Sequence, residues 1–234
     1  GRWGCMHASK VALHPEVTFT AIVDRQLTRA VEAAQMYGAR GAFADLDDAL
    51  SEFDACIIAL PIHLLVPVAE RCLKASKHVL IEKPGGLNTR EVTSLVDVQA
   101  SASRIAAIGF LERFNVGNSV QTGSVRSLAL WRSAPLGPRF GGLGLDWCCH
   151  DIDLAHWLTG EQLTVEHIHT ASKGVLRFRL SGHAASVRIN TRTGSRRVRR
   201  LVWADGTRIN LRTSGIDALS AQLDAFIGAI NGGG

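Results

Sequence analysis

The apolar and polar positions in the first half of the chain alternate between two periods. Short apolar runs that predict buried strands cover 17–24, 54–60, 77–82 and 104–110. Between them, apolar residues recur at helical spacing and predict helices over 26–38, 63–76 and 89–101, and a further helical stretch leads to Leu13. Strands and helices in strict alternation predict a parallel sheet with right-handed crossover connections.

Beyond about residue 112 the pattern changes to longer segments that are typical of strands. These segments cover 124–133, 163–172, 174–182, 184–191 and 198–213. Asp205-Gly206 is typical of a hairpin turn, and helices are expected at 145–160 and 217–230. We therefore expect an α/β domain over 1–111 and an α+β domain with a mainly antiparallel open sheet over 112–234.

Composition narrows the class of protein. The chain has 234 residues and is 46% apolar, which is enough to bury a large core. It contains no run of about 18 apolar residues, and its N-terminus lacks the residue order of a secretory signal, so we expect a cytoplasmic protein with no membrane partner. The 5 cysteines lack the spacing of a disulfide framework and are expected to be reduced.

The formal net charge of +5 is concentrated partly in the tract 192–200. Such a tract can bind an anionic partner, including a nucleic acid. It has no interleaved aromatic residues and lies between strand-like segments, which favours a solvated strand or turn. We therefore expect no nucleic-acid partner.

The N-terminal residues fit part of a dinucleotide-binding fingerprint. In Gly-x-Gly-x-x-Gly the backbone turns tightly after a strand and approaches a pyrophosphate at a helix N-terminus. Gly1 and Gly4 fit the second and third glycines, while the first glycine and its strand are absent, so we expect further residues upstream of Gly1 in the natural chain. Asp24, 20 residues beyond Gly4, fits the acidic residue that binds the ribose hydroxyls, or else it caps the helix near Gln26.

Glu82 and Lys83 stand where a buried strand ends and a Pro-Gly-Gly turn begins. A charged pair at that place loses hydration unless something uses the charges. The position therefore predicts a functional site, and the alternative is an ion pair that only closes the strand end.

Three polar residues recur at helical spacing in the expected helix 145–160. Asp146, His150 and Asp153 are spaced so that they share one face, and a histidine there is a candidate general base. The alternative is an ordinary wet face of a helix. The adjacent pair Cys148 and Cys149 point to different sides of a helix, so we expect no metal site.

Several segments in this order resemble the glucose-fructose oxidoreductase/inositol dehydrogenase (Gfo/Idh/MocA) family over nearly the whole chain. They read GRWG, VDR, ALP, KHVLIEKP, GFLERFN and DWCCHDIDLAHWLTG. The resemblance implies an N-terminal Rossmann domain that binds NAD or NADP, followed by an antiparallel sheet domain. It also implies a homo-oligomer that forms through this C-terminal sheet.

The resemblance also implies roles for individual residues. Lys83 would hold the substrate oxygen beside the nicotinamide, Glu82 would help to place it, and Asp146 and His150 would act from the opposite side. The candidate catalytic residues are Lys83, His150 and Asp146. The candidate cofactor-binding residues are Gly1, Arg2, Trp3, Gly4, Asp24, Arg25, Leu60, Pro61, Glu82, Lys83 and Pro84. The candidate substrate-binding residues are Lys83, Arg113, Asp146, His150 and Asp153.

The expected activity is hydride transfer between a nicotinamide and a secondary alcohol or ketone of a sugar, cyclitol or nucleotide-linked sugar. Asp24 favours NAD, because a carboxylate repels a 2′-phosphate, whereas Arg25 keeps NADP open. The alternative is a non-catalytic protein of the same fold that senses a dinucleotide. His7, on the first helix, is expected only to cap or pack.

Overall fold

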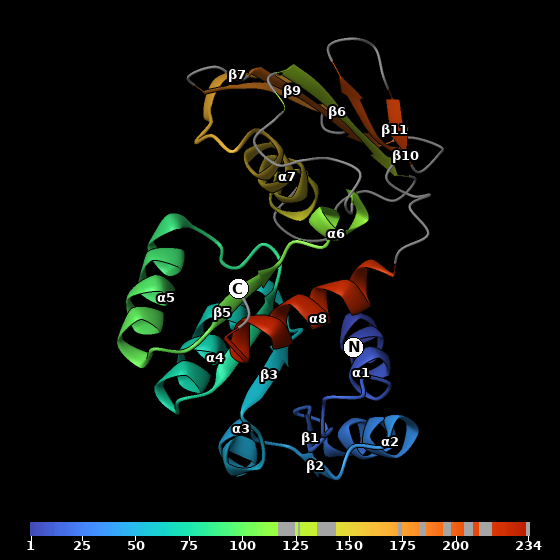
Figure 1. The fold of residues 1–234 in the computed structure, drawn as a ribbon, viewed down its shortest axis with the longest axis vertical. Coiled ribbons are helices and arrows are strands. Elements are labelled where there is room, and N and C mark those ends of the chain that lie inside the picture. The colour runs from blue at the N-terminus through green and yellow to red at the C-terminus, as the bar shows by residue number, and fades with distance from the viewer. Residues whose placement is uncertain are drawn as a thin grey trace. The chain divides into compact units, whose positions relative to one another are not determined.

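The computed structural model describes residues 1–116, 125, 127–134, 144–172, 175–182, 186–193, 198–203, 208–210 and 217–232. Two compact units make up the chain, Gly1–Gly109 with Leu219–Gly234, and Phe110–Ala218. The C-terminal helix α8 (Ala218–Ile230), red in Figure 1, therefore belongs largely to the first unit. We had expected this helix to belong with the second half of the chain.

The first unit contains two parallel ladders. β1 (Ala21–Val23) pairs with β2 (Gly41–Phe43). β4 (His78–Glu82) lies between β3 (Ala55–Ile58) and β5 (Ala106–Gly109). Among the strands that the structure describes, β1 and β3 do not pair with each other. The expected parallel arrangement is thus confirmed for both ladders.

The first strand is shorter than the expected 17–24, and its partner β2 was missed. Gly41-Ala42-Phe43 is too short to display an apolar period, so the sequence pattern gave no signal for it. The three-residue partner also limits β1, although two further backbone bonds join Arg40 to Phe19 and Gly41 to Thr20 just before the ladder begins.

The four expected helices of the first unit are present. They are α1 (Arg2–Val11), α2 (Leu27–Tyr37), α4 (Ile62–Lys74) and α5 (Thr89–Ala102). Gly38, with φ +74°, ends α2 in the left-handed conformation that a glycine adopts without strain. Asn88 caps α5 by accepting the Glu91 N–H, and the Glu91 carboxylate accepts the Leu87 N–H in return.

Apolar residues of α4 and β4 form the core of the first unit. α4 packs on β4 and against α5, and Figure 1 shows these two helices beside each other. The fully buried members include Leu65, Leu73, Val79 and Ile81. A short helix α3 (Leu46–Ala49), capped by Asp45, and a 3₁₀ turn (Leu50–Glu52) lead into β3 and were not expected.

The second unit is built on one mixed sheet. Its strands are β6 (Ser127–Ala134), β7 (Thr164–Ser172), β8 (Val175–Ser181), β9 (Ser186–Thr193), β10 (Val198–Trp203) and β11 (Arg208–Asn210). They lie in the order β11-β10-β6-β9-β8-β7, and only β6 and β9 run parallel. The mainly antiparallel character is confirmed. The expected strand 198–213 forms β10 and β11, while Asp205-Gly206 lies outside the described residues.

A helical segment covers one face of this sheet. The short helix α6 (Glu112–Val116) precedes it, and a π-helical turn (Gly144–Cys148) runs into α7 (Cys149–Thr159). Leu128 and Leu130 of β6 stand in register with Val187 and Ile189 of β9. All four side chains are buried with Leu154 and Leu158 of α7, as the strand period of two requires.

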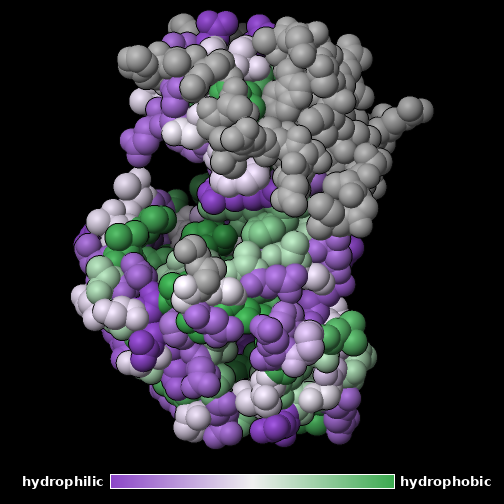
Figure 2. All heavy atoms as spheres, in the orientation of Figure 1, coloured by the Kyte–Doolittle hydropathy of each residue, from purple (hydrophilic) through white to green (hydrophobic). Residues whose placement is uncertain are grey.

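The molecular surface is mixed in polarity. Apolar and hydrophilic residues are interspersed over the visible face of the first unit in Figure 2. In the described part of the chain, we find no helix with both the length and the apolar character needed to cross a bilayer.

Candidate functional site

The glycines of the N-terminal loop leave the start of α1 open. The helix begins directly after Gly1, with Gly4 in its first turn, and this turn holds no acidic residue. A Cβ built on Gly1 would meet nothing within 4 Å, and one on Gly4 would meet only the Ala59 Cβ at 4.0 Å. Unpaired N–H groups and the helix dipole favour an anion at such a place. The loop therefore fits a pyrophosphate group.

Asp24 and Arg25 follow β1. Asp24 Oδ1 accepts the backbone N–H of Gln26 at 2.9 Å, and the Asp24 N–H donates to Phe43 O at 3.1 Å. This local bond supports the helix-entry role that we weighed for Asp24. The bond to Gln26 engages one carboxylate oxygen of Asp24 and fixes the side chain at the carboxyl end of β1, where a Rossmann unit binds the ribose.

The carboxyl ends of β3, β4 and β5 share one edge of their sheet, because the three strands are parallel. Leu60 and Pro61, both exposed, connect β3 to α4 at this edge, and Lys83 with Pro84 directly follows β4. Ligands of open α/β sheets bind outside the carboxyl ends of the strands. The structure thus brings these expected cofactor-binding residues to one edge of the sheet.

The turn after β4 is tightly built. Lys83-Pro84 is a cis peptide, and Gly85 follows with φ +87°. A Cβ on Gly85 would lie 2.8 Å from the Ile108 Cδ1 atom, so the turn packs closely on β5. The Glu82 carboxylate meets the His7 ring, with Nε2 and Oε1 2.7 Å apart. Sequence reasoning missed this contact, because the two residues stand 75 positions apart.

In the second unit, Asp146 lies in the π-helical turn and His150 in the first turn of α7. We expected a continuous α-helix there, and the π turn changes the spacing on which a shared face was argued. The His150 ring stands edge-on to Phe110, with centroids 6.4 Å apart and an interplanar angle of 78°. π turns are frequent at functional sites.

Two expected substrate-binding residues bind each other. The Arg113 guanidinium donates to both carboxylate oxygens of buried Asp153, at 2.8 Å from Nε to Oδ2, and also contacts the Phe110 face. A carboxylate held by two parallel bonds keeps a fixed orientation. Both oxygens of Asp153, an expected substrate-binding residue, are thus engaged by Arg113, another residue expected to bind substrate.

A buried ionic cluster in the same unit was missed by sequence reasoning. Arg132 of β6 donates to Asp151 Oδ1 at 2.6 Å and to Glu112 Oε1 at 3.1 Å, and all three residues are less than a tenth exposed. Burial opposes the charge of Arg132, but the carboxylates of Asp151 and then Glu112 outweigh burial and raise its pKa. The available signal was Arg132 directly after the apolar run 128–131 of this strand.

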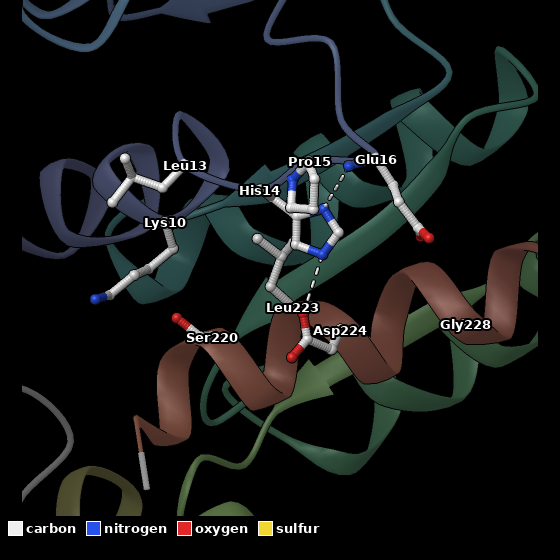
Figure 3. A pocket seen from close by; sticks show the side chains of 9 residues that line it. All are labelled: Lys10, Leu13, His14, Pro15, Glu16, Ser220, Leu223, Asp224 and Gly228. Atoms are coloured by element: carbon white, nitrogen blue, oxygen red, sulfur yellow. Dashed lines mark hydrogen bonds and ion pairs between the residues drawn. The ribbon is translucent and has the colours of Figure 1, made fainter.

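A pocket of about 470 Å³ lies between the end of α1 and α8 (Figure 3). Within it, His14 Nδ1 accepts the Glu16 N–H at 3.2 Å and Nε2 donates to Asp224 Oδ1 at 3.0 Å. Both ring nitrogens of His14 thus form hydrogen bonds, and the bond to Asp224 connects α8 to the segment that follows α1. The expected site residues are not among those that line this pocket.

The described residues include no group of three or more His, Cys, Asp or Glu side chains arranged to hold a metal ion. Cys56 and Cys72 meet across β3 and α4, with their sulfur atoms 3.6 Å apart. The five cysteines of the chain are free thiols.

The chain is similar in sequence to known oxidoreductases. Residues 1–110 match the Gfo/Idh/MocA family, described as "Oxidoreductase family, NAD-binding Rossmann fold". UDP-N-acetylglucosamine 3-dehydrogenase of Acidithiobacillus ferrooxidans is 33% identical over 168 residues, which are 69% of this chain and 53% of that protein. Inositol 2-dehydrogenase of Rhizobium meliloti is 27% identical over 176 residues, with the same shares. The chain spans about half the length of these curated relatives.

Solved structures agree on the fold. A structure of the Acidithiobacillus ferrooxidans enzyme superposes with a TM-score of 0.83 at 24% identity, covering 99% of this chain and 86% of that one. A myo-inositol dehydrogenase from Corynebacterium glutamicum gives a TM-score of 0.82 at 19% identity, covering 100% and 86%. Identities this low establish the fold alone.

Two parallel ladders, a glycine-led helix and a charged turn at the carboxyl end of β4 are together typical of a dinucleotide-binding unit of the Rossmann class. The family match, the relatives and the fold together narrow this class further. The chain belongs to the Gfo/Idh/MocA family of oxidoreductases.

Proposed function

We propose that the protein is an NAD(P)-dependent oxidoreductase that interconverts a secondary alcohol and a ketone. The observation that carries this proposal is Lys83, which directly follows β4 at the carboxyl edge of an NAD-binding Rossmann unit. Relatives of the chain are named as dehydrogenases of inositol and of UDP-N-acetylglucosamine.

The dinucleotide would be held along the carboxyl edge of the first unit. The first-turn amides of α1, at Gly1 to Gly4, would bind the pyrophosphate, and Asp24 would accept the ribose hydroxyls. Arg2, Trp3, Leu60 and Pro61 are further expected contacts. When bound, the nicotinamide supplies the hydride acceptor or donor.

Lys83 and His150 divide the remaining chemistry in this proposal. A lysine ammonium stabilises the negative charge that develops on the carbinol oxygen as hydride leaves the carbon. A histidine can take the hydroxyl proton during oxidation and return it during reduction. Asp146 is the candidate partner that orients the imidazole, and the Arg113 guanidinium held by Asp153 is a candidate donor to substrate hydroxyls.

We propose a polyhydroxylated substrate, either a sugar, a cyclitol or a nucleotide-linked sugar. Such molecules offer several hydroxyls to the polar groups of the second unit, namely Asp146, His150 and Arg113. The relatives named above act on substrates of these two kinds, and this likeness supports the class without selecting one member of it.

We favour NAD over NADP because of Asp24. A carboxylate accepts bonds from both ribose hydroxyls and repels a 2′-phosphate, whereas Arg25 is exposed beside it and can attract one. The Asp24→Ala variant should narrow the preference for NAD⁺ over NADP⁺ by about tenfold or more, measured as the ratio of calorimetric Kd values. An unchanged ratio would remove Asp24 from this role.

We also propose that the protein forms a homo-oligomer through the sheet of the second unit. β7 is an edge strand of that sheet, and its Val165 and Ile168 side chains are 52% and 68% exposed. Apolar groups on an open edge are suited to association. Light scattering on the purified protein should give a multiple of 25.2 kDa for this chain, and a monomer at micromolar concentration would contradict the proposal.

The experiment that tests the function is a turnover assay with NAD⁺ and NADP⁺ over a panel of cyclitols, sugars and nucleotide sugars. We expect cofactor reduction with at least one compound, and its loss in Lys83→Ala and in His150→Ala while calorimetry still detects the dinucleotide. Binding of the dinucleotide without turnover of any compound would instead support the non-catalytic sensor that shares this fold. Full turnover in Lys83→Ala would refute the proposed chemistry.

A further inference from the structure

A buried histidine of the glycine-led helix touches the residue next to the proposed catalytic lysine. His7 lies in α1, one turn beyond Gly4, and is only 5% exposed. Its Nε2 atom donates to Glu82 Oε1 at 2.7 Å, and the side-chain exposures of the two residues are 6% and 13%. The contact joins the helix proposed to bind the pyrophosphate to the strand that carries Lys83.

Glu82 is held from a second side by β5. Its register partner there is Gly109, and a Cβ on Gly109 would lie 3.5 Å from the Glu82 Cα and 3.7 Å from its carboxyl carbon. The same Cβ would lie 3.2 Å from the Ile81 carbonyl oxygen, which is tighter than ordinary contact. The missing side chain of Gly109 thus leaves room for the Glu82 carboxylate beside β5.

The backbone beyond Lys83 is also fixed. A Cβ on Gly85 would collide with Ile108, and one on Gly86 would lie 3.0 Å from Val92 Cγ2. The glycines therefore let the turn sit directly against β5 and α5. Lys83 lies between this packed turn and Glu82, which the His7 bond holds. We therefore expect a displacement of either neighbour to move the backbone of Lys83.

The Glu82 side chain is 13% exposed, so its carboxylate has lost most of its hydration, and the His7 bond offsets this cost without making the pair a net source of stability. An apolar pair of similar volume could fill the same space at no cost in hydration. The bond adds a fixed geometry, because a hydrogen bond of 2.7 Å to a carboxylate holds both partners within a small range of positions. Reaction rates are sensitive to displacements of this size at a catalytic group.

We propose that His7 is a positioning residue. It holds Glu82, and through Glu82 it fixes the position of the Lys83 ammonium relative to the start of α1, where the pyrophosphate is proposed to bind. This inference rests on the proposed role of Lys83 in hydride transfer. It adds that the phosphate-binding helix and the reactive turn act as one rigid piece, connected by the His7–Glu82 bond. His7 touches neither substrate nor reacting atoms in this role.

The test compares His7→Ala, His7→Gln and Glu82→Gln with the wild-type chain, using the compound that the panel identifies. The Gln side chain at position 7 retains an amide donor near the place of Nε2, so it should restore most of what Ala removes. We expect kcat, normalised to the protein that binds NAD⁺, to fall about 10–100-fold in His7→Ala, with the calorimetric Kd for NAD⁺ changed less than about threefold.

A readout that needs no substrate is hydrogen–deuterium exchange of the free protein. Loss of the His7 bond should speed exchange of the amides of residues 82–86, Pro84 excepted because it has no N–H, by about tenfold or more, while the amides of α2 and of the second unit keep their rates. The control is His14→Ala, which removes another histidine–carboxylate bond of the same unit, at 3.0 Å to Asp224, in a pocket that none of the expected site residues lines. It should leave exchange at 82–86 and kcat unchanged.

The possible outcomes separate the two claims. If Lys83→Ala abolishes turnover while His7→Ala and Glu82→Gln keep wild-type kcat and wild-type exchange at 82–86, the positioning role is overturned and the function stands. If Lys83→Ala keeps full turnover, the proposed chemistry of Lys83 fails, and the positioning role that rests on it fails with it. If no compound of the panel is turned over, the proposed function fails, whatever His7 does. If His7→Ala does not fold, His7→Gln and Glu82→Gln decide, since an unchanged kcat and exchange in both would overturn the inference.

Discussion

The two units of the chain bury charge in different ways. In the first unit, the His7–Glu82 pair stands at the end of β4, next to a lysine with a proposed chemical role. In the second unit, Arg132 of β6 bridges Glu112 of α6 and Asp151 of α7, so that this cluster joins three elements of the unit. In our proposal the pair in the first unit positions a reactive side chain, whereas the cluster in the second unit contributes to stability. In this comparison, the residues next to a buried charged pair indicate whether the pair serves chemistry or stability.

The largest expected effect on stability tests the second-unit cluster. Arg132→Met removes a buried cation and leaves the carboxylates of Glu112 and Asp151 without it, which should lower the free energy of unfolding of this unit by about 3–5 kcal/mol. Urea unfolding followed by tryptophan fluorescence reports on this unit, because it contains Trp131, Trp147, Trp157 and Trp203.

The matched control neutralises the two acids as well. Combining Arg132→Met with Glu112→Gln and Asp151→Asn should recover most of the lost stability, since no buried charge is then left alone. A loss below about 1 kcal/mol in the single variant would mean that the cluster is effectively solvated, and the comparison between the units would break down.

A smaller effect is expected at the turn of the first unit. Gly85→Ala forces a side chain into φ +87° and against Ile108, which should lower the free energy of unfolding by about 2–3 kcal/mol. Gly38→Ala has a similar φ of +74° but no neighbour within 4 Å, so strain alone should cost about 1–2 kcal/mol. Equal losses, measured by urea unfolding, would show that the turn is not packed as described.

The smallest effect concerns the pH dependence of the first unit. Burial, and next the Arg104 charge, lower the pKa of His78 below its ordinary value, and its Nδ1 atom accepts the Ile105 N–H at 3.0 Å. The unfolded chain therefore binds this proton more readily, so stability from His78 is complete above the ordinary histidine pKa and declines as the pH falls below it.

His78→Asn keeps an acceptor near the place of Nδ1 and removes the titration. We expect the free energy of unfolding of this variant to fall less than that of the wild-type chain between about pH 7 and pH 5. An identical fall in both proteins would assign the pH dependence to other groups.

In the first unit, the sequence pattern predicted the longer helices and strands better than the shortest ones. Apolar periods located β3, β4 and β5 with the helices between them, because each is long enough to show a period. β2 has three residues and shows none. In the second unit the strands were located, but the parallel pairing of β6 with β9 was not, since strand direction leaves no mark on the alternation of apolar residues.

The candidate site was predictable as a set of motifs and not as a set of contacts. Lys83 and His150 stood out because charged and titratable residues interrupt regular patterns. The His7–Glu82 and Arg132–Asp151 bonds join residues far apart in the chain, so local spacing contains no information about them. The π turn at Asp146 was likewise hidden, because an α-helix and a π turn have similar residue preferences.

The most direct measurement of the central claim follows deuterium from the substrate to the cofactor. The compound identified by the panel, deuterated at its carbinol carbon, is incubated with NAD⁺ and either the wild-type chain or Lys83→Ala, and the recovered cofactor is examined by NMR. We predict deuterium on the dihydronicotinamide ring with the wild-type chain, formed about 10³-fold more slowly with Lys83→Ala. Deuterium that appears only in solvent, or transfer at equal rates, would contradict hydride transfer assisted by Lys83.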